Sequence, residues 1–419
     1  MPPSPKIAIL GAGPAGLTLA SLLTKNSIPY TVFDLRSRPP PEAISQPSGS
    51  LDLHAESGLL ALKSCGLLEK FSQLEAECGE EMIVADMHGV VRHQDDGDGN
   101  RPEIARNALT QLLLDSVPEE NINWEKKVAS VAPSTSATGT WKLSFHPNSK
   151  GHGQDEEFDL VIGADGAWSK IRPAITDVKP YFSGVNCITL TIPHLNTTHP
   201  SLASLVGKGT YSACNATKAV MAQRGSLESA RIYLMIKSPE SCSSPESYLH
   251  DSGLDACTPE QLKAKLLSSP ELFAFWGEEL KQLVATGCEA ESASLGPDGR
   301  IEMRPLYMLP PGHTWEHKAG LTLVGDAAHL MTPFAGEGVN AAMLDALQLA
   351  QEIIKVSSSL DGAALALDQA AQTYEEGMFP RAKEIMEETF QNMNMIFSED
   401  SPKAFVEFFQ QAYGPPAEE

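Results

Sequence analysis

The stretch KIAILGAGPAGLTLASLLTK, residues 6–25, decides the fold of this chain. Residues 6–10 form a short apolar run, which predicts a buried strand. A glycine-rich turn follows, and a helix is predicted over residues 14–25. Residues 30–33 predict a second strand, parallel to the first. Together these elements are the β-α-β start of a doubly wound sheet, so the chain is expected to belong to the α/β class.

The turn Gly11-Ala12-Gly13-Pro14-Ala15-Gly16 has the spacing G-x-G-x-x-G between the predicted strand and the predicted helix. Gly11 permits the tight turn, Gly13 lets a pyrophosphate approach the backbone, and Gly16 allows close helix–strand packing. The helix N-terminus offers N–H donors and a positive dipole end to phosphate. Asp34 ends the second strand, 23 residues after Gly11, about where an acid binds a ribose hydroxyl. The run therefore predicts dinucleotide binding by Gly11, Gly13, Ala15, Gly16 and Asp34. The alternative is a glycine-rich turn that holds no ligand.

Composition narrows the class of protein. The chain has 419 residues and a formal net charge of −23, so nucleic-acid binding and anionic membranes are disfavoured. No apolar run approaches the roughly 20 residues of a membrane-spanning helix, and the glycines in the apolar N-terminal stretch argue against a signal peptide. The seven cysteines form no C-x-x-C pair, which predicts reduced thiols in a cytoplasmic protein without a metal site.

The order of the predicted elements indicates two joined domains. Residues 38–50 are rich in proline and serine and are expected to be a loop, while polar stretches at 132–140 and 147–157 are expected to be hairpin loops. Strand patterns with short turns fill the section up to residue 307, after which a buried-strand pattern returns at 321–324. The prediction is a doubly wound, Rossmann-type dinucleotide-binding domain with an inserted sheet-based substrate domain and C-terminal helices. The expected bounds are 1–176 and 308–360 for the first domain, 177–307 for the second and 361–419 for the C-terminal helices.

Two later runs distinguish FAD from NAD. In the first, Gly163–Arg172, a strand runs into an Asp-Gly turn centred on Asp165, followed by a serine and a basic residue. The alternative for this segment is an ordinary acidic turn that caps a helix. In the second, Gly325–Leu330 continues through Pro333–Asn340, so a strand delivers Asp326 to accept a bond from a polyol hydroxyl. A glycine-rich turn then opens a long helix, whose N–H groups can face the electron-rich edge of a reduced flavin.

With these three runs in order, the chain resembles the single-component FAD-dependent aromatic hydroxylases of the para-hydroxybenzoate hydroxylase type. The resemblance spans almost the whole chain. It is nearest to the tetracycline-inactivating monooxygenases, through the stretches SLDLH (50–54), EIARN (103–107) and HLM (329–331). The resemblance implies noncovalent FAD, NADPH as a transient reductant, and a role in secondary metabolism or antibiotic inactivation.

The resemblance also assigns roles to residues. Asp34 would hold the adenosine ribose, Arg106 the phosphate–ribityl region and Asp326 the ribityl chain. Asp52 would lie near the isoalloxazine, although capping of a turn is an alternative for this residue. His329 is expected to pack beneath the helix rather than act in catalysis. The cofactor residues implied by the whole set are Gly11, Gly13, Ala15, Gly16, Asp34, Asp52, Arg106, Asp165, Gly325, Asp326, Pro333, Gly336, Gly338, Val339 and Asn340. Thr189, Phe334 and Ala335 are the implied substrate contacts.

Departures from the family pattern fall where reductant and substrate bind. Ser45 stands where the relatives have an arginine that is implicated in NADPH use, and Arg36 or Arg38 is a speculative substitute. The positions of polar and basic substrate contacts align roughly with Thr189, Gly209 and Ile232, and none keeps the relatives' side chain. Tetracycline itself is therefore not expected to be the natural substrate.

The leading hypothesis is an FAD-dependent monooxygenase that consumes NAD(P)H and O2. It would hydroxylate a polycyclic aromatic or polyketide-like molecule through a flavin C4a-hydroperoxide. The cofactor carries this chemistry, which explains why no acid–base pair stands out in the sequence. One alternative keeps the fold but performs Baeyer–Villiger, oxidase or dehydrogenase chemistry. Another is a flavin-bearing binding protein without catalysis. A monomer without nucleic-acid partners is expected.

Overall fold

The predicted β-α-β start is confirmed. A computed structural model describes residues 5–74, 79–97, 99–135, 139–150, 154–239, 247–296, 298–357 and 363–413. Strand β1 (Ile7–Leu10) is followed by helix α1 (Pro14–Lys25) and by strand β2 (Thr31–Phe33), which is parallel to β1. Every residue of β1 is buried, as expected for a strand covered on both faces.

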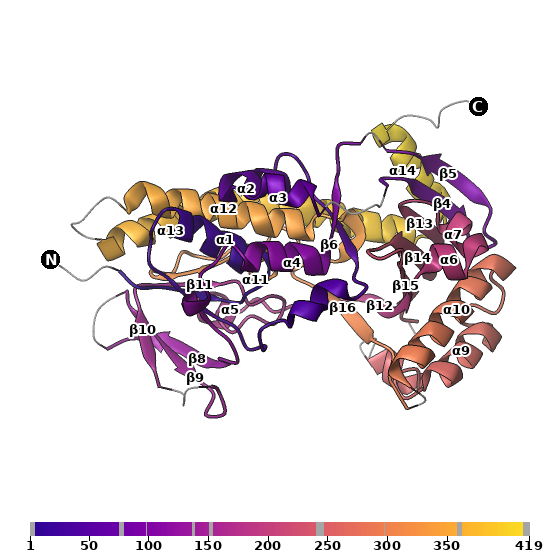
Figure 1. Cartoon of the computed structure of the whole chain (residues 1–419), viewed down its shortest axis with the longest axis horizontal. Helices are drawn as coiled ribbons and strands as arrows, with labels where there is room; N and C mark the ends of the chain where they lie inside the picture. The colour runs from indigo at the N-terminus through magenta and orange to yellow at the C-terminus, as the bar shows by residue number, and fades with distance from the viewer. Residues whose placement is uncertain are drawn as a thin grey trace.

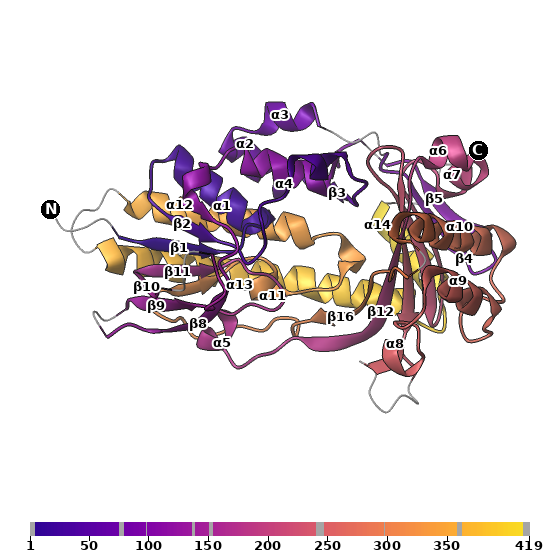
Figure 2. The same cartoon turned by 60° about the horizontal axis from the view of Figure 1, so that its bottom comes forward.

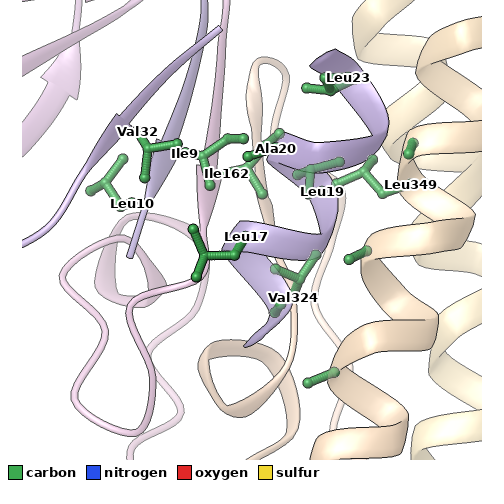
Figure 3. Close-up of a cluster of buried hydrophobic side chains, with 14 of the residues drawn as sticks. Ile9, Leu10, Leu17, Leu19, Ala20, Leu23, Val32, Ile162, Val324 and Leu349 are labelled. Atoms are coloured by element: carbon green, nitrogen blue, oxygen red, sulfur yellow. The ribbon is translucent and has the colours of Figure 1, made fainter. Parts of the chain in front are cut away.

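A five-stranded parallel sheet forms the first of two main parts of the molecule (Figure 1). Its order is β17-β11-β1-β2-β7, and its later strands are β7 (Ile122–Asn123), β11 (Leu160–Gly163) and β17 (Leu321–Leu323). In Figure 3, side chains of α1 such as Leu17 and Ala20 lie against Ile9 and Ile162 of the sheet. The helices on this side of the molecule are α2 (Gly58–Cys65), α3 (Leu68–Ser72), α4 (Arg106–Leu114) and α12 (Gly338–Val356).

A small antiparallel sheet belongs to the same part. It consists of β8 (Val128–Pro133), β9 (Trp141–Phe145) and β10 (Glu156–Phe158), in the order β10-β9-β8. The polar stretches between them therefore connect neighbouring antiparallel strands, as predicted, although 136–138 and 151–153 lie outside the described residues. Short elements nearby are η2 (Glu119–Asn121) and α5 (Arg172–Ile175).

The second part of the molecule is built on a seven-stranded sheet of order β16-β12-β15-β14-β13-β4-β5 (Figure 2). Its strands are β4 (Met82–Asp86), β5 (Val91–Asp95), β12 (Tyr181–Ile192), β13 (Thr210–Asn215), β14 (Lys218–Arg224), β15 (Ala230–Lys237) and β16 (Met303–Met308). The expected insertion of 177–307 misses β4 and β5, because these strands come from earlier in the chain: β4 pairs with β13 across a long sequence separation, and β5 pairs with β4.

The two faces of this sheet have different partners. On the outer face, residues such as Ile188 and Leu190 pack under helices in one buried cluster. The other face, which includes Cys187 and Met235, packs on residues near the C-terminus, such as Phe397. The helices of this part are α6 (Leu195–Thr198), α7 (Pro200–Val206), α8 (Tyr248–Asp251), α9 (Pro259–Ser268) and α10 (Glu278–Leu295).

The stretch 38–50 contains more regular structure than a loop. Residues Pro41–Ser45 form the short 3-10 helix η1, in which proline occupies the first turn. Strand β3 (Ser50–Asp52) then pairs antiparallel with β6 (Glu103–Ala105). A proline near the start of a helical turn costs no hydrogen bond, since those N–H groups lack intrahelical acceptors in any case. The prediction that residues 38–50 are a loop was wrong for the five residues of η1 and for Ser50, which begins β3.

The predicted C-terminal helices link the two parts. After β17 come α11 (Asp326–His329) and the 3-10 helix η4 (Pro333–Ala335); α12, α13 (Ala363–Ile396) and α14 (Lys403–Tyr413) follow. Helix α13 runs from the five-stranded sheet to the seven-stranded sheet (Figures 1 and 2). None of the described helices is long and apolar enough to cross a membrane. The five described cysteines are free, and Cys78 and Cys242 lie outside the described residues.

Candidate cofactor and active site

The glycine-rich turn between β1 and α1 contains three glycines, and only at Gly13 is there room for an added side-chain atom. A Cβ on Gly11, where φ is +110°, would lie 2.2 Å from the Ala164 carbonyl oxygen. A Cβ on Gly16 would lie 1.9 Å from the Gly11 oxygen, so packing requires both glycines. At Gly13, by contrast, no described heavy atom lies within 4 Å of that position. This is the cradle that an approaching pyrophosphate needs, and the turn therefore fits a dinucleotide.

Asp34 lies beside this turn. Its Oδ2 accepts a hydrogen bond of 2.7 Å from the Ala12 N–H, and Arg36 donates to both of its oxygens at 2.7 and 3.0 Å. Burial favours a raised pKa for this carboxyl, but the hydrogen bonds from Arg36 and Ala12 outweigh it and hold the pKa below the usual value. The Arg36 backbone N–H also donates to Oδ1 at 2.7 Å, so four hydrogen bonds fill the roughly four acceptor sites of this carboxylate. A ribose hydroxyl would therefore have to replace one of these donors, and the exposed Arg36 side chain is the one that can move. Because Arg36 is paired with Asp34, and Arg38 with Glu119, neither is a free substitute for the arginine missing at Ser45.

The Asp165 turn lies against the glycine-rich turn, since Gly11 abuts Ala164 and Asp165. The Oδ2 atom of Asp165 accepts the Lys170 N–H at 2.6 Å, within the turn that precedes α5, and it does not cap that helix. Its Oδ1 atom is buried and has no hydrogen-bond partner among the described residues. Burial raises the pKa of this carboxyl. An orphaned buried acceptor is costly, so Asp165 has an acceptor left for a ligand hydroxyl.

Arg172 joins the second motif to the third, a role that sequence reasoning missed. It is buried and donates to carbonyl oxygens of Ala167 at 2.9 Å, Asp326 at 3.1 Å and Ala327 at 2.8 Å. The only signal in the sequence was a basic residue after the Asp-Gly turn. Since guanidinium presents several donors in a fixed plane, it can hold two backbone turns at one spacing.

Asp326 follows strand β17 and begins α11. Its side chain is accessible, yet surrounding protein raises the pKa of its carboxyl by burial, against the favourable charges of His329, Arg106 and Arg172. Arg106, at the start of α4, is exposed, and its backbone N–H donates to Gly49. Asp326 thus presents an accessible carboxylate near the accessible guanidinium of Arg106. A carboxylate can accept ribityl hydroxyls, and a guanidinium can bind the adjacent phosphate.

A second missed residue, Asp345 on α12, holds the Gly325 turn. Its Oδ2 accepts from the Gly325 N–H at 2.8 Å and from the His329 imidazole at 2.6 Å, and Arg381 donates to Oδ1 at 2.5 Å. The carboxylate raises the pKa of His329, although burial opposes this. His329 is buried in this network, so the expectation that it packs beneath the helix is confirmed.

The loop before α12 faces β3. Gly336 has a left-handed backbone (φ +73°), and a Cβ there would lie 3.8 Å from Oδ1 of Asp52. Gly338 has no described heavy atom within 4 Å of its Cβ position, so the helix N-terminus is open to a ligand. Asn340 is different: its side chain is buried, accepts from the His54 N–H and donates to the Asp52 carbonyl, both at 3.0 Å. Its amide therefore clamps β3 to α12 and is not free for the cofactor.

The loop's remaining residues have different surroundings. Pro333 is exposed, and the Ala335 N–H donates to Thr389 at 3.0 Å. Phe334 is half-buried and makes an edge contact with Phe397, with ring centroids 5.7 Å apart. Val339 is partly buried against the core of the first part. The loop thus contributes an aromatic side chain to the junction between the two parts.

The rough alignment of substrate contacts is corrected at two positions. Ile232 is fully buried on the outer, helix-covered face, because strand side chains alternate. Its neighbour Tyr233 lies on the inner face, with its hydroxyl 3.1 Å from the Cβ position of Gly49. Gly209 is required by packing, since a Cβ there would lie 2.1 Å from the Glu81 carbonyl oxygen. Thr189, on β12, is buried, and its Oγ1 lies 3.8 Å from the Cys187 sulfur on the inner face.

The doubly wound sheet, the open glycine cradle and the exposed Asp326 carboxyl after β17 define a flavoprotein built like the aromatic hydroxylases. The chain belongs to the family described as FAD binding domain, whose model matches residues 5–202 and 314–389. Over its length it is similar to two fungal proteins. Monooxygenase asqM of Emericella nidulans is 39% identical, with 96% of this chain and 97% of that protein covered. Monooxygenase penA of Penicillium thymicola is 41% identical, with 94% and 96% covered.

Solved structures share the fold. Klebsiella pneumoniae HpxO complexed with FAD and uric acid has a TM-score of 0.72 at 17% identity, over 97% of this chain and 92% of that one. The tetracycline destructase Tet(51) has a TM-score of 0.67 at 19% identity, over 98% and 96%. The expected likeness to tetracycline-inactivating enzymes is thus present in the fold. With its monooxygenase relatives and its family, the chain is an FAD-dependent monooxygenase.

Proposed function

We propose that the protein uses NAD(P)H and O2 to hydroxylate a flat, largely apolar molecule with several rings, of the polycyclic aromatic or polyketide-like kind. The observation that carries this is the inner face of the seven-stranded sheet opposite the loop that precedes α12. Half-buried apolar and aromatic side chains pack together there: Met221, Tyr233, Phe334 and Phe390. Apolar and aromatic linings with few polar groups suit flat hydrophobic ligands.

In this proposal the chain's own residues bind and orient FAD. The N–H groups around Gly13 would hold the pyrophosphate and Asp34 the adenosine ribose. Asp326 and Arg106 would hold the ribityl–phosphate region, and the open helix start at Gly338 would face the ring. Bound FAD would supply the redox chemistry: it would accept a hydride from NAD(P)H and activate O2, so that one oxygen atom enters the substrate and the other leaves as water.

The apolar sheet face has a separate task in the proposal. Thr189, Phe334 and Ala335 would line the substrate side, and the packed junction between the two parts would exclude water from the reacting atoms. Exclusion of water prevents loss of activated oxygen as peroxide. Tyr233 is a further candidate contact, because its ring lies on the inner face and its hydroxyl lies beside Gly49.

The test supplies NADPH or NADH, 18O2 and a panel of phenols, polyketides and anthraquinones. A product that gains one 18O atom and resists alkaline hydrolysis supports hydroxylation. A product that alkali cleaves as an ester or lactone supports Baeyer–Villiger insertion, the alternative that the serine at position 45 keeps open. NAD(P)H consumption that yields only peroxide with every compound, or a product that lacks 18O, would refute the proposal.

A further inference from the structure

The side chain of His54 links β3 to the loop before α12. Its Nε2 lies 3.0 Å from Oδ2 of Asp52, and its Nδ1 lies 3.2 Å from Oε1 of Glu337. The imidazole is 7% exposed, whereas Asp52 is 31% and Glu337 22% exposed. A third carboxylate, Glu56, lies 3.9 Å from Nδ1 and is 79% exposed. His54 thus lies between a carboxylate on β3, Asp52, and a carboxylate in the loop before α12, Glu337.

Hydrogen bonds between the backbone of residues 52–54 and the Asn340 side chain also connect β3 with α12. The His54 N–H donates to Oδ1 of Asn340, whose Nδ2 donates to the Asp52 carbonyl oxygen. Ser57 donates its hydroxyl to the same Oδ1 at 3.3 Å. A Cβ on Gly58 would lie 2.6 Å from this oxygen, so the chain packs closely around the amide. Asn340 fixes the backbone of residues 52–57 on α12, and His54 adds the side-chain half of the contact.

We infer that His54 is a positioning residue, which ties Asp52 to Glu337 and thereby holds residues 333–340 in the conformation that receives the flavin ring. The inference rests on the proposed cofactor site, because Asp52 and Gly336 are its expected ring neighbours. Nothing in the proposed oxygen-transfer chemistry requires this histidine. Its contribution is the geometry of a loop whose Gly336 faces the Asp52 carboxylate.

The charge state of His54 follows from its partners. A neutral imidazole has one N–H, so it can donate to only one carboxylate; an imidazolium donates to two. The hydrogen bonds to Asp52 and Glu337 outweigh burial and raise the pKa of His54 to about 10. Without the imidazolium between them, the carboxylates of Asp52 and Glu337 would repel one another. The positive charge on His54 therefore stabilises the contact between β3 and the loop before α12.

Other charged groups face the same cluster. Glu388, on α13, has a raised pKa, mainly through burial and also through the charge of Glu337. Arg101 and His54 counter this effect. The cluster is rich in acids, so loss of the imidazolium leaves more negative charge than before. We expect the loop to move away from β3 in that case.

The experiment compares His54→Leu and Glu337→Gln with the matched control Glu56→Gln, which alters an exposed carboxylate near the same imidazole. Hydrogen exchange is measured in apoprotein and holoprotein, together with the FAD dissociation constant and the ratio of peroxide to NADPH consumed. We expect His54→Leu to speed exchange at least tenfold in 333–340, to weaken FAD at least tenfold and to raise peroxide release. Glu337→Gln should change all three in the same direction, and Glu56→Gln should change each less than twofold.

A combined His54→Leu, Glu337→Gln chain should be no worse than His54→Leu alone, since the two residues make one link. The inference is overturned if exchange in 333–340 stays as in the parent, if Glu56→Gln matches Glu337→Gln, or if the two effects add. Should His54→Leu fail to fold, His54→Gln is judged by the same criteria. Hydrogen exchange in the apoprotein tests the role of His54 even if the parent chain proves not to oxygenate any compound. The inference about His54 and the proposed monooxygenase function can therefore fail separately.

Discussion

Replacement of Gly13 by alanine separates cofactor binding from folding. Gly13 is the N-cap of α1, with φ −89° and ψ −177°, a backbone that alanine adopts freely. No described heavy atom lies within 4 Å of the new methyl group. Alanine is a poorer N-cap than glycine by up to about 1 kcal/mol, but the gain from a less flexible unfolded chain is about 0.4–1 kcal/mol. The free energy of unfolding of the apoprotein should therefore change by less than about 1 kcal/mol.

FAD binding should change far more. The methyl group occupies the space through which the pyrophosphate reaches the backbone N–H groups, and one lost charged hydrogen bond costs about 1.5–3 kcal/mol. The FAD dissociation constant should then rise about 10- to 150-fold. Flavin fluorescence titration measures the constant, and urea unfolding of the apoprotein measures stability.

Gly16→Ala is the contrasting variant. Its methyl group would lie 1.9 Å from the backbone oxygen of Gly11, which cannot move as a flexible side chain can. The apoprotein should lose about 1–3 kcal/mol of stability, the usual cost of overpacking. The reasoning is refuted if Gly13→Ala binds FAD as tightly as the parent, or if it destabilises the apoprotein as much as Gly16→Ala does.

Asp326→Ala should purify colourless, because its accessible carboxyl is assigned to the ribityl chain; a fully yellow variant would contradict the assignment. Arg106→Ala should weaken FAD by about 1.5–3 kcal/mol, as measured by fluorescence titration. Arg172→Met should lower the free energy of unfolding by about 3–5 kcal/mol, because it leaves buried carbonyl oxygens without hydrogen-bond donors. Lys170→Met, at an exposed position, should not lower it. The raised pKa of His54 stabilises the fold fully below about pH 6.5, and this contribution should disappear as pH rises through about 10. Urea unfolding between these pH values should show that decline in the parent and a flatter profile in His54→Leu.

Much of the nucleotide-binding part was predictable. The strands around the glycine-rich turn, the Asp165 turn and the Gly325 turn all lie where the sequence indicated. Each is a local pattern, in which a buried apolar run leads directly into a turn of small residues. The roles of individual residues in that site stay predictions until a bound cofactor or a variant tests them.

Other features were not predictable from local patterns. Strand β4 joins the second sheet by pairing with β13, more than a hundred residues later, and β5 joins it by pairing with β4. Ile232 and Tyr233 differ by one position, yet strand alternation turns one outward and the other toward the junction. Asn340 looked like a cofactor contact, but its amide is used by the backbone of β3.

The sequence by itself determined the β-α-β start and its glycine-rich turn at 11–16, because an apolar run, the G-x-G-x-x-G spacing and a helical pattern are all local signals. Only the tertiary structure decided which of those glycines is open, since Gly11 and Gly16 are filled by Ala164 and by the turn itself while Gly13 is not. It also brought Arg172 to Asp326 and His54 to Glu337. Such pairs depend on how sheets and helices pack across long separations, and no local pattern encodes that packing.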